Sequence, residues 1–251
     1  MANDTLMLAA DTSTRHCTVA VCRFDAAGRC EVAAQTSVDQ KRLHAERLMD
    51  AMQATLDACE YSLESISCLA VSIGPGSFTG LRVGAAAWKG LAFALQLPLV
   101  PVPTLDAMSL LNSVPNGIAV PMLDARMDEV FGAVYRFKDG QREKCTPDRV
   151  CTVEVLLDEG GLQKTPFIAL GDGALRYQDR ITETAPHAYI AGNAYGIPRA
   201  DAVAREGYAL LCAGANTDAA RAAPQYLRAS QAEQAREQRL KSEASAAQAT
   251  T

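Results

Sequence analysis

A glycine-rich turn that opens into an almost wholly apolar helix constrains this chain more than any other feature. The apolar run 69–73 leads into the turn 74–80, and the helix expected at 80–95 carries only two charged side chains, Arg82 and Lys89. These lie seven residues apart, so they share one narrow stripe of the helix. Because a surface helix normally keeps a polar face, we expect one side of this helix to pack on the chain's own sheet and another to be covered by a second chain.

The turn resembles a phosphate-binding loop, since backbone N–H groups at a helix start can hold an anion. A Walker loop, however, has Lys and Ser or Thr directly after its last glycine, where this chain has Leu81 and Arg82 after Gly80. The spacing of Gly74, Gly76 and Gly80 is also one residue too long for a dinucleotide fingerprint. The pattern favours a strand-to-helix turn that uses glycines for backbone geometry and close helix contact. A phosphate or nucleotide contact is the alternative.

The composition is that of an ordinary globular chain. Of 251 residues, 49% are hydrophobic and 21% are charged, enough for one large or two modest cores. The formal net charge of −5 argues against a protein that grips nucleic acid alone, but it leaves open a subunit whose partner supplies the basic face. No apolar run approaches the roughly 20 residues of a membrane span, and the first residues show no export signal. We therefore expect a cytoplasmic protein without a membrane anchor.

The chain has eight cysteines at irregular spacings and no C-x-x-C pair. Most stand among apolar neighbours, which predicts buried, reduced thiols in a cytosolic protein and no zinc site. These residues are Cys17, Cys22, Cys30, Cys59, Cys68, Cys145, Cys151 and Cys212.

The first part of the chain shows the order β-β-β-α-β-α-β. The helix expected at 43–59 has apolar residues every three or four positions, and the turn 25–28 joins two alternating strands into a hairpin. The strands are expected at 6–10, 17–24, 30–36, 69–73 and 99–102, and in the second half at 119–123, 130–137 and 167–170.

The second half repeats two signposts of the first in the same order. A strand near residue 118 ends at Asp124, as the first strand of the chain ends at Asp11. Gly171-Asp-Gly173 follows a later strand, as Gly74-Pro-Gly76 does in the first half. The repetition predicts a duplicated α/β fold with two similar domains that face each other.

Asp11 stands where the first strand ends, a usual place for a carboxylate to meet a metal-bound phosphate. Actin-type kinases and ATPases place glycines after such an Asp, whereas Thr12, Ser13 and Thr14 follow here. The pattern favours a carboxylate and hydroxyls that close a β-hairpin and cap its amides, and a metal-associated role for Asp11 is the alternative.

Asp124 and Arg126 mirror this arrangement in the second half. Arg is suited to bidentate contact with a carboxylate or a phosphate. Because both residues fall in a turn, we expect an ordinary ion pair on a solvated hairpin.

No motif in the chain assembles a self-sufficient active site. Its three histidines, His16, His44 and His187, form neither H-E-x-x-H nor the H-x-x-x-H spacing of a helix-borne metal site. No serine or cysteine stands in a G-x-S-x-G elbow.

Six segments between about residue 5 and residue 228 together resemble the bacterial TsaB (YeaZ) family. They are Leu8-Ala-Ala-Asp-Thr-Ser-Thr14, His44-Ala-Glu-Arg-Leu48, Gly74-Pro-Gly-Ser-Phe-Thr-Gly-Leu-Arg-Val-Gly84, Lys89-Gly90, Asp124-Ala-Arg126 with Glu129, and Gln225-Tyr-Leu-Arg228. The eleven-residue glycine segment is the most specific of the six.

The resemblance implies a duplicated actin-like fold (ASKHA, ribonuclease H-like) with two mixed-sheet domains, 1–104 and 105–228. It also implies a non-catalytic scaffold and dimerisation subunit of the complex that adds threonylcarbamoyl to A37 of tRNAs reading ANN codons. In that family the paralogue TsaD performs the transfer and holds a metal through paired histidines, which this chain lacks, and TsaE is the ATPase partner. tRNA is then bound only through the complex, the free protein can form a homodimer, and the older M22 glycoprotease label is misleading.

The family's contact helices with TsaD correspond to residues 43–59 and 80–95. The interface residues expected on them are Leu48, Met52, Leu56, Gly80, Gly84, Ala87, Trp88 and Leu91. Gly84 and Ala87 lie one turn apart, where small side chains permit close approach of a partner helix. As an alternative, the same small positions pack on the chain's own sheet.

The resemblance also places a vestigial nucleotide cleft between the two halves, without a catalytic residue, a metal ligand or a tightly bound cofactor. Its residues are Asp11, Thr12, Ser13, Gly74, Gly76, Asp124 and Arg126. The cleft leaves room for a weak ATP or ADP contact within the complex. The alternative function is an actin-fold phosphotransferase or ATPase that uses Asp11.

Removal of the tail, residues 229–251, should leave folding and TsaD binding nearly unchanged. The segment has seven alanines, four glutamines, six charged residues and a single larger apolar residue, Leu240. It therefore cannot bury enough surface to offset the entropy of ordering it. Thermal melting and a TsaD titration of the truncated chain check this. A melting temperature several degrees lower, or lost binding, would show that the tail docks.

Overall fold

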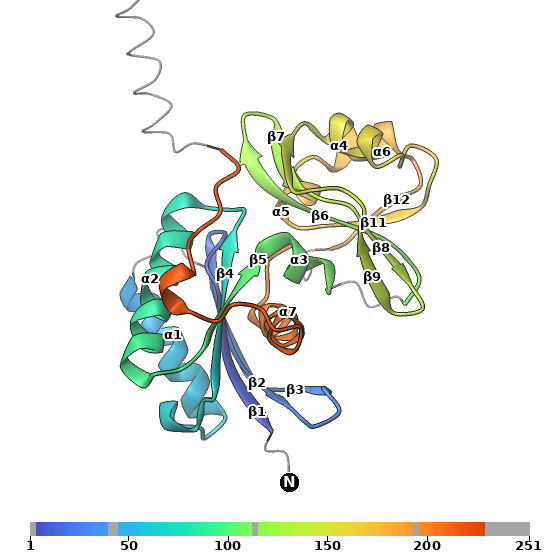
Figure 1. The fold of residues 1–251 in the computed structure, drawn as a ribbon. Helices are drawn as coiled ribbons and strands as arrows, with labels where there is room; N and C mark the ends of the chain where they lie inside the picture. The colour runs from blue at the N-terminus through green and yellow to red at the C-terminus, as the bar shows by residue number, and fades with distance from the viewer. Residues whose placement is uncertain (1–3, 40–44, 112–114, 193–195, 229–251) are drawn as a thin grey trace, which may run out of the picture.

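A computed structural model describes residues 4–39, 45–111, 115–192 and 196–228 (Figure 1). His44 and the 229–251 tail, both part of the expectations above, lie outside the described residues. Among the described residues, no helix is long and apolar enough to cross a membrane.

The first half has the predicted order of elements. They are β1 (Thr5–Asp11), β2 (His16–Phe24), β3 (Cys30–Asp39), α1 (Ala45–Ala58), η1 (Leu63–Ser65), β4 (Cys68–Gly74), α2 (Phe78–Leu95) and β5 (Leu99–Pro103). In the second half they are α3 (Thr104–Ser109), β6 (Gly117–Arg126), β7 (Glu129–Gly132), β8 (Tyr135–Lys138), β9 (Gln141–Lys144), β10 (Arg149–Cys151), α4 (Val153–Glu159), β11 (Phe167–Leu170), α5 (Asp172–Arg176), α6 (Gln178–Thr184), β12 (Ala188–Ile190), α7 (Ala200–Cys212) and η3 (Ala219–Arg221).

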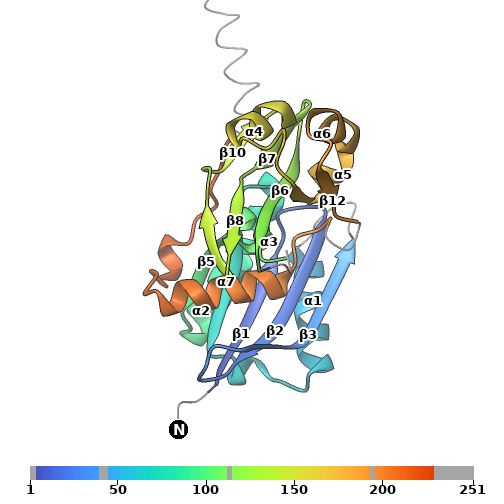
Figure 2. The same cartoon turned by 90° about the vertical axis from the view of Figure 1, so that its right-hand side faces the viewer.

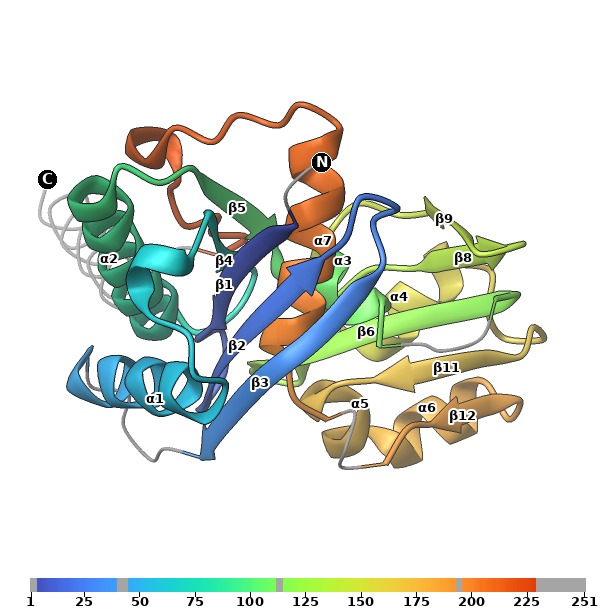
Figure 3. The same cartoon turned by 90° about the horizontal axis from the view of Figure 1, so that it is seen from below.

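The first sheet has the order β3-β2-β1-β4-β5, with β1, β4 and β5 parallel and the β1–β2–β3 meander antiparallel. Strands β1, β2 and β4 are buried on both faces, so alternate residues of one strand belong to two different cores. Leu6 and Leu8 pack with α1 and α2, whereas Met7 and Ala9 pack with α7. Figure 3 shows α1 and α2 side by side on one face and α7 on the other.

The second sheet has the order β10-β7-β6-β11-β12, and β8 and β9 extend it from the other end of β6. The single strand expected at 130–137 is wrong, because two strands, β7 and β8, pair with different parts of β6. Between them Val134 leaves the ladder: its carbonyl accepts from Cys145 N at 2.8 Å, and its N–H donates to Thr146 Oγ1 at 2.9 Å.

The C-terminal part of the chain returns to the first sheet. Helix α7 lies across that sheet (Figure 2), and Ala200 and Val203 are buried in its core. The segment 217–225 then runs along β5, α2 and β4: Leu99 N donates to Thr217 O at 3.0 Å, and Gln225 N donates to Ile73 O at 2.7 Å. The division at residue 104 stays a prediction, and the structure adds that residues 200–225 pack with the first sheet.

Glycines of helix α2 allow it to pack closely against the β1–β2 hairpin. Its N-cap Ser77 accepts from Gly80 N at 3.3 Å, and Thr12 Oγ1 donates to Gly80 O at 2.8 Å. A Cβ added at Gly84 would lie 2.3 Å from Thr12 Oγ1, and one added at Gly80 would lie 2.0 Å from Thr12 O. Of the two alternatives for Gly84, the structure therefore gives contact within the chain.

Gly84→Ala should unfold more easily than the wild type by about 1–3 kcal/mol, because the methyl group overpacks the contact with Thr12. Gly90→Ala is the matched control, since an added Cβ there meets no atom within 4 Å. It should gain up to about 1 kcal/mol from helix propensity. Urea unfolding of both variants measures the difference. Equal effects of the two substitutions would show that Gly84 does not sit against Thr12.

Candidate functional site

Asp11 lies at the end of β1 and is enclosed by its own hairpin. Its Oδ1 accepts from Ser13 N at 2.9 Å and from Ser13 Oγ at 2.8 Å, and only 1% of the residue is exposed. Among the described residues, neither Asp11 Oδ2 nor the buried Ser72 hydroxyl has a hydrogen-bond partner. Burial raises the pKa of Asp11, and the neighbouring Ser72 and the hydrogen bonds from Ser13 oppose that rise. The carboxyl group of Asp11 is thus buried, and its pKa lies above the ordinary value.

The glycine turn closes the hairpin from outside. Ser77 N donates to Ser13 O at 2.6 Å, and a Cβ at Gly76 would lie 2.5 Å from that same oxygen. Thr12 and Ser13 are both buried. The turn therefore packs directly against the backbone of the first hairpin.

The second hairpin, β6–β7, holds a more open carboxylate. Arg126 pairs with Asp124 as predicted, with NH1 at 3.4 Å from Oδ2, and Arg126 N donates to Oδ1 at 2.9 Å. Arg176 also approaches Asp124 Oδ2, at 3.6 Å, and Tyr177 OH donates to Oδ1 at 3.3 Å. Because the side chain of Arg126 is 73% exposed, this pair contributes little to stability.

Asp172 of α5, which is not among the site residues expected from the sequence, binds Asp124. Its Oδ1 accepts from Asp124 N at 3.0 Å. Burial raises the pKa of Asp172. Its place inside Gly171-Asp-Gly173, directly after a strand, is the signal in the sequence that marks this residue.

The C-terminal strap, residues 222–228, connects the glycine turn to the second hairpin (Figure 1). At one end Gln225 binds Ile73 next to the turn. At the other, Arg228 pairs with Glu129, and its NH1 donates to Ala125 O at 2.9 Å. The strap explains why Gln225-Tyr-Leu-Arg228 and Glu129 occur together in the sequence pattern, a link that spacing alone did not reveal.

Most of the interface residues predicted on α1 and α2 do not lie on the surface, so the prediction is wrong for them. They are buried in the chain's own core, where a partner cannot reach them: Leu48, Met52, Leu56, Gly80, Gly84 and Trp88. Trp88 Nε1 donates to Leu8 O of β1 at 3.3 Å, which fixes that face of α2 on the sheet. Only Ala87 and Leu91 of the predicted set are partly exposed.

A different side of α2 remains open, and it is apolar. Phe93 is 80% exposed, and Ala86, Gly90 and Ala94 are exposed beside it. We call this surface the α2 face; its residues are Val83, Ala86, Ala87, Gly90, Leu91, Phe93 and Ala94.

Both charged side chains of α2 are drawn away from this face. The guanidinium of Arg82 lies 3.9 Å from the centre of the Phe78 ring, and its Nε donates to Tyr226 OH at 3.0 Å. Lys89 Nζ donates to Ala220 O at 3.2 Å. The C-terminal segment thus binds the two charged side chains that would otherwise extend from α2 into water.

The described residues contain no group of three or more His, Cys, Asp or Glu placed to hold a metal ion. The candidate site has two parts. One is the pair of hairpins joined by the C-terminal strap, with the enclosed carboxylate of Asp11 in the first hairpin, and the other is the open apolar α2 face.

Comparison with known proteins finds one matching family model and several relatives of similar sequence. The family model described as "TsaD: tRNA N6-adenosine threonylcarbamoyltransferase" matches residues 31–236. The tRNA threonylcarbamoyladenosine biosynthesis protein TsaB of Haemophilus influenzae is 38% identical over 183 residues, which are 68% of this chain and 73% of that protein. TsaB of Bacillus subtilis is 29% identical over 177 residues, 70% of this chain and 75% of that protein.

A solved structure has the same fold. It is a Pseudomonas aeruginosa protein described as similar to peptidase YeaZ, with a TM-score of 0.73 and 28% identity, covering 89% of this chain and all of that one. With two mixed sheets flanked by helices, the predicted duplicated actin-like α/β fold is confirmed.

Asp11→Asn should raise the melting temperature at about pH 8 and raise it less near pH 4. Asparagine keeps the Oδ1 acceptor for Ser13 and can donate to Ser72. Because the pKa of Asp11 is raised on folding, its contribution to stability is fully present below the pKa of the unfolded chain and is lost as pH rises through the folded value. The asparagine variant stays neutral, so it does not lose this stability as the pH rises.

Asp50→Asn, on the exposed side of α1, is the control and should show no such pH-dependent gain. Differential scanning calorimetry across this pH range measures both variants. An Asp11→Asn protein less stable than wild type at every pH would mean that the carboxylate is needed in its charged form.

Proposed function

The chain belongs to the TsaB (YeaZ) family, and from this membership we propose that it serves in tRNA threonylcarbamoyladenosine biosynthesis as the non-catalytic scaffold that binds the TsaD paralogue. The observation that carries the proposal is the exposed apolar α2 face. A monomer rarely leaves a contiguous apolar surface on a regular helix without a partner to cover it.

The composition of the α2 face suits a protein–protein contact. Its small residues, Ala86, Gly90 and Ala94, allow another backbone to come close, and Phe93 supplies an aromatic anchor. The face carries no charged side chain, so its burial requires no desolvation of an ion. Helix α1 lies beside it on the same side of the sheet (Figure 3), and its exposed Arg47, Asp50 and Asp57 provide a polar rim.

The geometry around Asp11 supports a subunit without its own chemistry. The carboxylate is 1% exposed, whereas a metal-associated carboxylate has to lie within reach of a phosphate. The enclosed position of Asp11 therefore disfavours the phosphotransferase or ATPase alternative. The isolated protein should show neither peptidase activity nor threonylcarbamoyl transfer, and a weak ATP or ADP contact would form only within the complex.

The remaining partners follow from the same proposal. TsaE joins the TsaD-bound assembly as its ATPase, and tRNA is bound through the complex, because a net charge of −5 gives this chain little affinity for nucleic acid by itself. In the absence of TsaD, the α2 face can bind a second copy of the chain. One lobe is the first sheet with residues 1–104 and the returning segment 200–225, the other is the second sheet, and the protein acts in the cytoplasm, where tRNA is modified.

Phe93→Asp should weaken TsaD binding by about 2 kcal/mol, roughly 30-fold in Kd, because it places a charge in the centre of an apolar contact. The fold should be unaffected, since Phe93 is 80% exposed. Tyr189→Asp is the matched control: Tyr189 is 66% exposed on β12 of the other sheet, and its variant should bind as the wild type does.

Isothermal titration with purified TsaD measures both affinities, and thermal melting confirms that both variants fold. Wild-type affinity of the Phe93→Asp variant would exclude the α2 face as the contact. Equal losses in both variants would place the contact elsewhere or make it non-specific.

A further inference from the structure

The tip of the β6–β7 hairpin holds a methionine in an unusual backbone conformation. Arg126 pairs with Glu129, so Met127 and Asp128 form the two-residue turn, with φ values of 54° and 60°. Gly, Asn and Asp adopt this left-handed region readily, whereas a long side chain such as that of Met is disfavoured there. Met127 is also 77% exposed, so packing within the chain offsets little of this cost. A strained, exposed apolar residue of this kind points to a contact outside the chain.

The chain fixes this turn from both of its flanks. Arg228 of the C-terminal strap pairs with Glu129 after the turn and donates to Ala125 O before it, at 2.9 Å. The guanidinium of Arg228 also lies 4.0 Å from the sulfur of Met127. Met127 is thus presented on a preorganised turn, which reduces the entropy that a partner has to remove when it binds.

Two further exposed apolar side chains lie on the strap, which runs from α2 to this hairpin (Figure 1). Tyr226 is 40% exposed and Leu227 is 37% exposed. We call Met127, Tyr226 and Leu227 the strap patch. Tyr226 OH accepts from Arg82 Nε at 3.0 Å, and its ring lies 4.5 Å from the ring of Phe78. The strap patch therefore begins at the first turn of α2.

The strap patch continues the α2 face. Arg82, Ala86, Gly90 and Phe93 are all exposed and follow one another at intervals of three or four residues, so they lie on one stripe of the helix. Because Arg82 binds Tyr226, this stripe leads from Phe93 to the strap patch.

A partner that covers the α2 face needs more surface than that face provides. A stable protein–protein contact uses about 20–30 residues from each side, whereas the α2 face has seven. One neighbour of the face is α1, whose exposed residues are mainly polar: Arg47, Asp50, Gln53 and Asp57. The other neighbour is the strap patch, which is apolar. The apolar contact can therefore grow only along the strap, while α1 supplies a polar rim.

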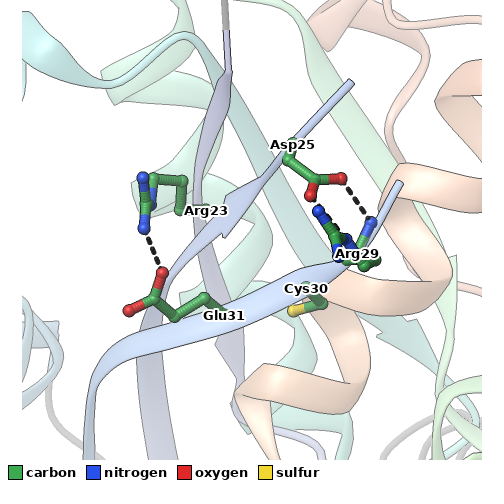
Figure 4. A pocket seen from close by; sticks show the side chains of 5 residues that line it. All are labelled: Arg23, Asp25, Arg29, Cys30 and Glu31. Atoms are coloured by element: carbon green, nitrogen blue, oxygen red, sulfur yellow. Dashed lines mark hydrogen bonds and ion pairs between the residues drawn. The ribbon is translucent and has the colours of Figure 1, made fainter. Parts of the chain in front are cut away.

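The pocket on the β2–β3 hairpin, by contrast, offers a partner little apolar surface. It has a volume of about 240 Å³, and charged side chains form most of its lining (Figure 4). Arg29 pairs with Asp25 at 2.7 Å, and Arg23 pairs with Glu31, so these charges already have partners. The strap patch, not this pocket, therefore adds apolar area to the α2 face.

We propose that the strap patch is a second anchor of the surface that binds the TsaD paralogue, so that one partner contacts both lobes of this chain. The inference rests on the proposed function and adds the strap and the β6–β7 hairpin to the contact made by α2. The partner surface that fits is apolar and has a recess for the unbranched side chain of Met127, which fills irregular gaps well.

The first test is isothermal titration of Met127→Asn with TsaD. Asparagine is tolerated in the left-handed region, so the variant should melt at the wild-type temperature or above it. It should bind about tenfold more weakly, because the anchoring side chain is gone. Leu227→Ser should weaken binding as well. Tyr189→Asn is the matched control: Tyr189 is 66% exposed on β12 of the same lobe, and its variant should bind as the wild type does.

Hydroxyl-radical footprinting tests the contact in the wild-type chain, without a substitution. Met127, Phe93 and Tyr189 are exposed targets, and trypsin places Met127 in peptide 127–136, where it is the only methionine. In the complex with TsaD, Met127 and Phe93 should be protected, whereas Tyr189 should be labelled as in the free protein.

Wild-type affinity of Met127→Asn, together with weak binding of Phe93→Asp, overturns this inference and leaves the proposed function intact. Absence of TsaD binding by the wild-type chain overturns both. The inference is also overturned if Met127 stays fully labelled in the complex while Phe93 is protected.

Two other occupants of the strap patch would be recognised in the free chain. If Met127 is protected without TsaD and becomes labelled when residues 229–251 are removed, the chain's own C-terminal segment covers the patch. If that protection increases with protein concentration, a second copy covers it. Either result overturns the inference.

Discussion

The contact between Thr12 and Gly80 determines the geometry on which the rest of this structure depends. A hydrogen bond of 2.8 Å and a backbone approach that leaves no room for a Cβ hold the start of α2 against the end of β1. With this end of the helix fixed, Leu81, Gly84 and Trp88 turn toward the sheet and are buried. The opposite side, with Phe93, is then left open. One close backbone contact therefore decides both the enclosure of the first hairpin and the face that α2 presents to a partner.

The sequence predicted the elements of the first half well, because apolar periodicity depends on local residues. It also predicted that α2 has two covered sides. It did not predict which residues belong to which side: small residues at Gly80 and Gly84 permit close approach to any neighbour, and the neighbour is Thr12 of the same chain. The assignment of Leu48 and Trp88 to an interface failed for the same reason, since an apolar helix position shows that it is buried but not by what.

The second half was less predictable, because its decisive contacts join distant segments. The break between β7 and β8 depends on hydrogen bonds from Val134 to Cys145 and Thr146, and no local pattern marks it. The pairing of Asp124 with Arg126 was predicted because the two residues are neighbours in the chain. Its support by Asp172, 48 residues away, became visible only in the fold.

The charges of α2 connect the strap to the proposed interface. On the sequence, Arg82 and Lys89 mark the stripe of the helix that should meet water. In the structure, Arg82 packs on the Phe78 ring and donates to Tyr226, and Lys89 binds the carbonyl of Ala220, so both charged side chains have partners within the chain. An ion on a contact surface has to lose its water when a partner binds, which costs free energy unless the partner supplies a counter-charge. By engaging these two residues, the C-terminal segment leaves a face that can be covered without that cost. The C-terminal segment that joins the two hairpins thus also keeps the exposed face of α2 free of charge.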